Sequence, residues 1–168
     1  MNIALNGLSN VDLRQQALWR EETTMRIRVD SSSVMTASLV TNGGDATSES
    51  ISAVPLDALV ASRRLELPRL DMLKMDAEGA ELSALIGMRD TLTRCRPRIV
   101  MEVNRPTLAS LDASVDDVWA FLRDLSYEVY AFETWTEQDP THVPDLDDLK
   151  RRCPPDSLVD IVAIGETR

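Results

Sequence analysis

The chain has 168 residues, 43% of them hydrophobic, which suffices for one domain with a substantial core and is too few for two. Its formal net charge is -10, and such a surface repels phosphate backbones and anionic lipid heads. Nucleic acid and membrane surfaces are therefore excluded as main partners, and a neutral or cationic small molecule or another protein is favoured.

The sequence has no features of a membrane span or an export signal. Its apolar runs stay short of the roughly 18 residues that a span needs. The stretch from Met1 to Gly7 has no basic region followed by an apolar core of signal-peptide length. Cys95 and Cys153 are far apart and outside any C-x-x-C arrangement, so we expect reduced thiols and a cytoplasmic protein.

The N-terminal part of the sequence predicts a short helix followed by strands. Residues 2–8 are typical of the last turns of a helix, with Asn6-Gly7 as its stop signal. Short apolar stretches are expected as strands at 11–18, 25–29 and 51–56. Segments rich in turn formers are expected as loops at 31–33 and 41–45. A helical turn from Leu56 to Val60 then leads past Pro68 towards the next strand.

From residue 70 onward the sequence alternates between strands and helices. Strands are expected at 70–76, 98–104, 128–132 and 158–164. The helix after Gly79 has an apolar face formed by Leu82, Leu85, Ile86 and Leu92. The next helix opens with a capping-box-like start at Ser114 to Asp117 and has an apolar face formed by Val115, Val118, Trp119, Leu122 and Leu125. This alternation predicts an α/β fold with a mostly parallel sheet and an antiparallel strand at its C-terminal end.

Residues 133–156 interrupt this alternation. The segment is rich in Pro and Asp and is predicted to be a long loop, which in a compact domain is either functional or disordered. We expect this loop to be placed where it can cover a site. It contains Trp135 and the only histidine, His142, and packing is an equally good interpretation for the tryptophan.

The most informative segment is Leu70 to Leu82, which runs from a buried strand through two carboxylates and a glycine into a helix. Strands at 70–76 and 98–104 would bring Asp76, Glu78 and Glu102 together at the carboxyl edge of a sheet. Such carboxylates can hold a divalent cation, accept a proton from a substrate hydroxyl or bind an ammonium group. Asn104 is a further candidate at this edge.

Each of these acids also has a structural interpretation. Asp76 or Glu78 can cap the following helix, and for Glu81 capping is the favoured role. Glu102 ends a buried strand and needs a partner whatever its function. Lys74 is expected to pair with one of the acids. The sequence has no G-x-S-x-G, P-loop or H-E-x-x-H pattern.

Residues Leu73 to Glu81, followed by Leu85 to Met88 and Arg96 to Glu102, resemble the central motif of the FkbM family. The members of this family are S-adenosylmethionine-dependent methyltransferases of the class I, Rossmann-like type. Three upstream segments are also similar to the family: Asn2 to Val11, Gln16 to Leu18 and Val54 to Leu59. After residue 104 only the order of strand, helix and strand agrees.

The resemblance implies methyl transfer, usually to a hydroxyl oxygen of a small molecule, sugar or natural product. Asp76 would face the reacting groups, as general base or as ligand of an assisting divalent cation, and Glu78 and Glu102 would support it. Ala17 and Leu18 would lie beside the adenine. Transfer from a sulfonium needs an acceptor oxygen that is in line with the methyl group and partly deprotonated, so positioning and one base are sufficient.

The sequence departs from the family pattern at the cofactor loop. In this fold the first strand carries a glycine-rich loop and the second ends in an acid for the ribose, but none of the six glycines here forms such a unit. We therefore expect residues 1–168 to be one partial, N-terminally truncated methyltransferase domain. The missing strands would leave an exposed apolar sheet edge that favours self-association, and this chain alone would bind S-adenosylmethionine weakly or not at all.

Two other functions compete with an O-methyltransferase. The chain can be an inactive remnant that serves as an interaction or structural domain. A metal-dependent hydrolase or phosphotransferase using Asp76, Glu78 and Glu102 is less favoured, because no phosphate-cradling element accompanies the acids. The sequence leaves the acceptor and the oligomeric state open.

Overall fold

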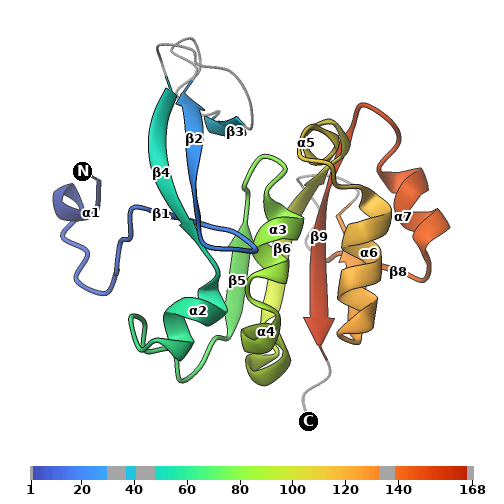
Figure 1. Ribbon diagram of the computed structural model, residues 1–168. Helices are drawn as coiled ribbons and strands as arrows, with labels where there is room; N and C mark the ends of the chain where they lie inside the picture. The colour runs from blue at the N-terminus through green and yellow to red at the C-terminus, as the bar shows by residue number, and fades with distance from the viewer. Residues whose placement is uncertain (1, 30–36, 41–47, 133–138, 166–168) are drawn as a thin grey trace.

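The computed structural model describes residues 2–29, 37–40, 48–132 and 139–165, whose strands form two sheets (Figure 1). Sheet A has the order β1-β4-β2-β3 and consists of β1 (Gln16–Leu18), β2 (Thr23–Val29), β3 (Ala37–Val40) and β4 (Ser48–Val54). Sheet B has the order β5-β6-β9-β7-β8 and consists of β5 (Met72–Met75), β6 (Arg98–Asn104), β7 (Tyr127–Ala131), β8 (Thr141–Val143) and β9 (Leu158–Gly165).

The helices of the described residues are short. They are α1 (Asn2–Leu5), α2 (Leu56–Ala61), α3 (Glu81–Ile86), α4 (Arg89–Cys95), α5 (Arg105–Ser110), α6 (Val115–Asp124) and α7 (Leu146–Arg152). Among these described helices none has the length and apolar character needed to cross a membrane.

The strand directions of sheet B correct the expectation of a mostly parallel sheet. β5 and β6 pair in parallel, whereas β9 pairs antiparallel with both β6 and β7. β9 lies between β6 and β7, so these two strands run in the same direction without pairing. One inserted strand therefore creates two antiparallel pairs, and β8 adds a third beside β7. The expected antiparallel strand at the C-terminal end is confirmed as β9.

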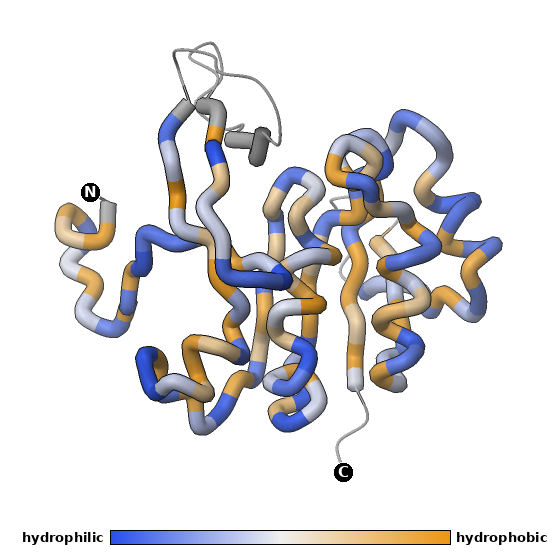
Figure 2. Tube along the Cα trace, viewed as in Figure 1, coloured by the Kyte–Doolittle hydropathy of each residue, from blue (hydrophilic) through white to orange (hydrophobic). Residues whose placement is uncertain are grey.

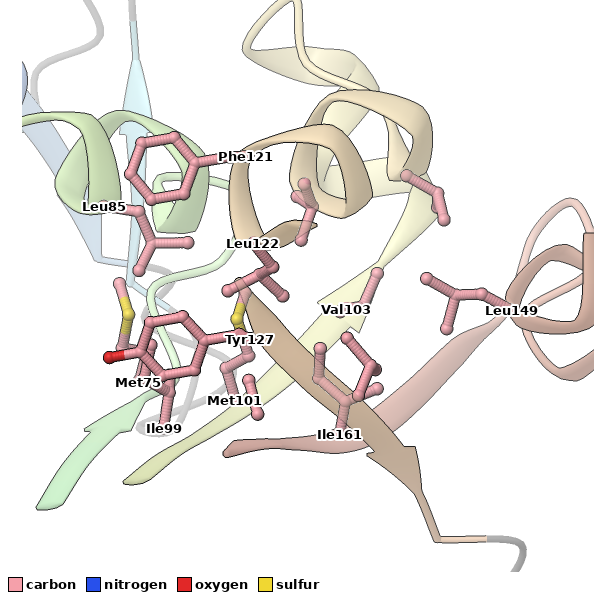
Figure 3. Close-up of a cluster of buried hydrophobic side chains, with 14 of the residues drawn as sticks. Met75, Leu85, Ile99, Met101, Val103, Phe121, Leu122, Tyr127, Leu149 and Ile161 are labelled. Atoms are coloured by element: carbon pink, nitrogen blue, oxygen red, sulfur yellow. The ribbon is translucent and has the colours of Figure 1, made fainter. Parts of the chain in front are cut away.

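One face of sheet B carries the main core. Burial alternates along β6, where Ile99, Met101 and Val103 are buried and the residues between them are partly exposed, as expected for a pleated strand. Phe121 and Leu122 of α6 lie over these side chains (Figure 3). Figure 2 shows hydrophobic positions concentrated along the strands of sheet B and hydrophilic ones at the outer turns of the helices.

The helix predicted after Gly79 is divided into α3 and α4. Gly87 ends α3 where the chain passes close to the backbone at Trp19, so that an added Cβ would lie 2.1 Å from the Trp19 carbonyl oxygen. Leu85 and Leu92 are fully buried as predicted, but Ile86 is 41% exposed. The predicted apolar face is thus wrong at Ile86, because the break ends the helical periodicity there.

The capping box of α6 is confirmed. The Ser114 hydroxyl accepts a hydrogen bond from the Asp117 N–H, and the Asp117 carboxylate accepts one from the Ser114 N–H. Val115, Val118 and Leu122 are buried as predicted.

The segment 133–156 is only partly a loop. Residues 133–138, including Trp135, lie outside the described residues. β8 pairs antiparallel with β7, and Asp145 caps α7 by accepting a hydrogen bond of 2.8 Å from the Asp148 N–H. The Pro and Asp content that favoured a loop therefore belongs in part to a helix start.

The predicted N-terminal helix and strands occur in the expected order but with other lengths, and β3 is an additional strand that was not predicted. Only Gln16–Leu18 of the expected strand at 11–18 forms β1, and the expected loops at 31–33 and 41–45 lie outside the described residues. Figure 1 shows α1 and the segment leading to β1 standing away from sheet B. Several large apolar residues there are exposed: Leu5, Leu8, Val11 and Leu13.

Candidate active site

A cavity of about 310 Å³ is lined by residues from the terminal strands of both sheets. β1 contributes Ala17 and Leu18, and β5 with the residue after it contributes the stretch from Leu73 to Asp76. Most of the remaining lining is apolar, and Lys74 and Asp76 are its charged residues. This volume and this mixture of an apolar wall with a few charges are typical of small-molecule sites.

A tight turn after β5 forms one wall of the cavity. The Ala80 N–H donates to the Ala77 carbonyl oxygen at 3.1 Å, and the two central residues have positive φ, +49° at Glu78 and +100° at Gly79. This is the sign pattern of a type I′ turn, which a glutamate rarely adopts. Asp76, Ala77 and Ala80 all line the cavity, so the turn determines its shape.

Gly79 is required by a close backbone approach. A Cβ there would lie 2.2 Å from the carbonyl oxygen of Thr107 in α5. The turn is therefore packed directly against the helix that follows β6, and no side chain fits between them.

Lys74 was expected to pair with one of the acids, and it pairs with Asp76. Lys74 Nζ lies 2.8 Å from Asp76 Oδ2, and the two side chains are 62% and 53% exposed. An ion pair this exposed contributes at most about 1 kcal/mol. A ligand that enters the cavity can therefore separate the two side chains at small energetic cost.

Glu102 lies opposite a carboxylate that the sequence analysis did not identify, Asp160 of β9. Burial raises the pKa of Glu102, the hydrogen bond from Asn104 opposes this, and the charges of Asp76, Asp160 and Glu78 raise the pKa further. Asp76 and Glu78 are thus both within electrostatic range of Glu102. Burial likewise raises the pKa of Asp160, with Lys74 lowering it and Asp76 raising it.

The sequence could not reveal Asp160 because its position depends on strand order. Buried and partly exposed residues alternate along β9, and Asp160 is one of the partly exposed residues. Only the pairing of β9 with β6, which are more than 50 residues apart in the chain, places it opposite Glu102. Alternating burial is the one local signal that favours an accessible side chain at this position.

Glu81 is 2% exposed and does not cap the first turn of α3. Its carboxylate oxygens accept hydrogen bonds from the N–H groups of Ala77 at 2.8 Å and Gly79 at 2.9 Å. The residue thus caps the preceding turn, which corrects the expected helix-capping role.

Of the three predicted acids only Asp76 lines the cavity, and Glu78, Glu102 and the remaining candidates lie outside its lining. Asn104 caps α5 by accepting a hydrogen bond from the Thr107 N–H, and its amide donates to Glu102. His142 lies on β8, the last strand of sheet B, where its Nε2 is 3.0 Å from Glu128 Oε2. Within the described part of the chain, no group of three or more His, Cys, Asp or Glu side chains is arranged to hold a metal ion.

Comparisons with known proteins assign the chain to a family. A model of the methyltransferase FkbM domain matches residues 1–129. The crystal structure of methyltransferase FkbM from Methylobacillus flagellatus KT is similar in fold, with a TM-score of 0.51 and 15% sequence identity over 96% of this chain and 32% of that one. The chain thus spans about a third of that protein, and no curated protein sequence matches it. Because the domain model covers most of its residues, the chain belongs to the FkbM methyltransferase family.

Proposed function

We propose that the chain carries part of the site of an S-adenosylmethionine-dependent methyltransferase that acts on a hydroxyl oxygen of a small molecule or sugar. Family membership supports methyl transfer. The observation that carries the proposal is the shared cavity, whose lining includes both Ala17 and Leu18 of β1 and Asp76 after β5. These are the residues expected beside the adenine and beside the reacting groups.

The lining fits two parts of the proposed cofactor. Ala17, Leu18 and Met88 offer an apolar surface on which an adenine ring can pack, and Asp76 offers a negative charge for a sulfonium. Bound S-adenosylmethionine would supply an electrophilic methyl group. Asp76 would accept the proton of the acceptor hydroxyl, and Lys74 would hold the Asp76 carboxylate in place before the acceptor enters.

Glu78 and Glu102 would act through their charges. The charges of Asp76 and Glu78 raise the pKa of Glu102, so these carboxylates share one negatively charged environment, which attracts a cationic sulfonium. In this proposal Asp76 is the base, and the other two acids add to the negative charge that favours the sulfonium. A divalent cation is not part of it, because the described residues offer no metal-binding group.

Asp76→Asn tests the proposed base. We expect formation of S-adenosylhomocysteine with a panel of hydroxyl acceptors to fall about a hundredfold or more, since a general base contributes that much. Asp71→Asn is the matched control, because Asp71 also pairs with a basic residue two positions away, Arg69 at 2.7 Å, and is outside the cavity lining. Because weak cofactor binding is expected, the assay uses millimolar S-adenosylmethionine, and equal, measurable rates in wild type and Asp76→Asn would contradict the assignment.

We further propose that this chain alone binds the cofactor weakly. None of the lining residues is a glycine, so the lining does not offer the glycine-rich backbone on which the carboxyl end of such cofactors rests. Isothermal titration of the purified chain with S-adenosylmethionine is expected to give a dissociation constant weaker than micromolar. A micromolar value would contradict this expectation.

A second candidate, an inactive interaction domain, is favoured by the exposed apolar side chains. Leu5 is 81% exposed and Met72 60%. Translating the DNA upstream of Met1 in frame separates the two candidates: a strand followed by a glycine-rich turn supports the methyltransferase, and an in-frame stop codon directly before Met1 supports the interaction domain.

A further inference from the structure

Glu81 is a buried carboxylate with no ion pair among the described residues. It is 2% exposed, and both of its oxygens accept hydrogen bonds from backbone N–H groups of the turn after β5. A buried carboxylate is costly in free energy unless its hydrogen bonds are made. A position that only had to fill space at the start of α3 would be occupied more favourably by an apolar residue.

The hydrogen bonds of Glu81 hold the turn in a conformation that its sequence disfavours. Glu78 has a φ of +49°, which is unfavourable for a residue with a side chain. Glu81 accepts hydrogen bonds from the N–H groups of the residues on either side of Glu78, Ala77 and Gly79. One carboxylate therefore holds the Asp76–Ala77 peptide group, where the chain enters the turn, and the Glu78–Gly79 peptide group, which follows the strained residue.

The fixed turn also determines how the cavity is lined. Asp76 directly precedes the turn, and Asp76, Ala77 and Ala80 are all lining residues. The other side of the turn is packed against α5, where a Cβ at Gly79 would meet the carbonyl oxygen of Thr107. The turn is thus held by hydrogen bonds to Glu81 and by its packing against α5, and three residues in and next to it line the cavity.

We propose that Glu81 is a positioning residue of the cavity, whose buried carboxylate fixes the turn from Ala77 to Ala80 and thereby the direction in which Asp76 enters the cavity. The inference rests on the proposed function, because the direction of Asp76 matters for a reaction only if the reaction takes place in this cavity. It adds a role that the motif alone did not indicate, since Glu81 itself lines no part of the cavity.

The test compares Glu81→Gln with the wild-type chain by NMR. Gln has the same shape but only one accepting oxygen, so we expect the amide protons of Ala77 and Gly79 to exchange with solvent at least about tenfold faster. We also expect the carboxyl titration of Glu102 to shift towards its ordinary range, because Asp76 and Glu78 move away from it. A residue that only stabilised the fold would leave this titration unchanged.

Asp57→Asn is the matched control. The Asp57 carboxylate also accepts two backbone hydrogen bonds, from Asp90 at 2.8 Å and Thr91 at 2.9 Å, and lies outside the cavity lining. The Asp57→Asn variant is expected to lower the stability of the fold. The amide exchange rates of Ala77 and Gly79 and the titration of Glu102 are expected to stay as in wild type. If Glu81→Gln does not fold, Glu81→Asp, which keeps the charge but is one methylene shorter, is measured in the same way.

Two results overturn the inference: Ala77 and Gly79 exchange rates unchanged in the folded variant, or a Glu102 titration that stays at its wild-type position. Titration of the labelled wild-type chain with S-adenosylmethionine to millimolar concentration tests the proposed function separately. If no signal near Leu18 or Asp76 moves, the proposed function fails for this chain, while the exchange and titration results still decide the role of Glu81.

Discussion

Gly79 has less freedom than any other residue of the turn. Its φ is +100°, and a Cβ would lie 2.2 Å from the backbone of Thr107. We expect Gly79→Ala to lower the free energy of unfolding by about 2 kcal/mol or more, because backbone strain and a backbone clash combine. Urea denaturation measures this, with Gly7→Ala as control, since Gly7 also has a positive φ, +63°, but no atom within 4 Å of an added Cβ. Equal losses in the two variants would show that the contact with Thr107 is unimportant.

Glu102 and Glu128 are predicted to change the pH dependence of stability in opposite directions. Burial raises the pKa of Glu102, so its stabilising contribution is complete below its ordinary pKa and is lost as the pH rises through the folded-state value. Hydrogen bonds from His142 and Arg123 lower the pKa of Glu128, so its contribution is present at neutral pH and is lost as the pH falls.

Denaturation at a series of pH values tests these signs. Glu102→Gln is expected to raise stability relative to wild type at neutral pH and to lose this advantage in acid. Glu128→Gln is expected to lower stability at neutral pH, with the deficit shrinking in acid. The same sign of change for both variants at neutral pH would contradict the assignment of burial as the dominant influence on Glu102.

At the level of single residues, local signals limit which candidate residues the sequence can point to. Asp76 and Glu102 were identified because the ends of β5 and β6 are visible as the ends of apolar runs. Asp160 was missed because it reaches Glu102 only through the pairing of β9 with β6. The buried position of Glu81 depends in the same way on tertiary packing.

At the level of elements, features set by local contacts could be predicted from the sequence, and features set by distant contacts could not. α6 was predicted with its cap because the Ser114 and Asp117 side chains interact with backbone only three residues away. The break between α3 and α4 was missed because it depends on the contact of Gly87 with Trp19. β8 has only three residues, too few for an alternating pattern to be recognised.

The cap of α6 gives an element-scale prediction. Ser114→Ala removes the hydroxyl that accepts from the Asp117 N–H at 3.2 Å, and we expect a loss of about 1 kcal/mol in the free energy of unfolding. Ser110→Ala is the control, because the Ser110 hydroxyl donates to a carbonyl within its own helix at 2.6 Å and caps no N–H group. Denaturation midpoints with an unchanged m-value give the comparison, and equal losses would argue against the cap.

At the scale of the whole molecule, the exposed strand edge predicts self-association. β5 is the terminal strand of sheet B among the described strands, and its first residue, Met72, is 60% exposed. An apolar strand edge of this kind pairs readily with another chain. We expect sedimentation velocity to show an average mass that rises with protein concentration. Met72→Lys is expected to make this rise smaller, since a charge on an edge strand opposes pairing. Ile86→Lys is the control, because Ile86 is 41% exposed but lies at the end of α3 rather than on a strand. Association that is equally weakened by both variants would indicate nonspecific apolar contact rather than edge pairing.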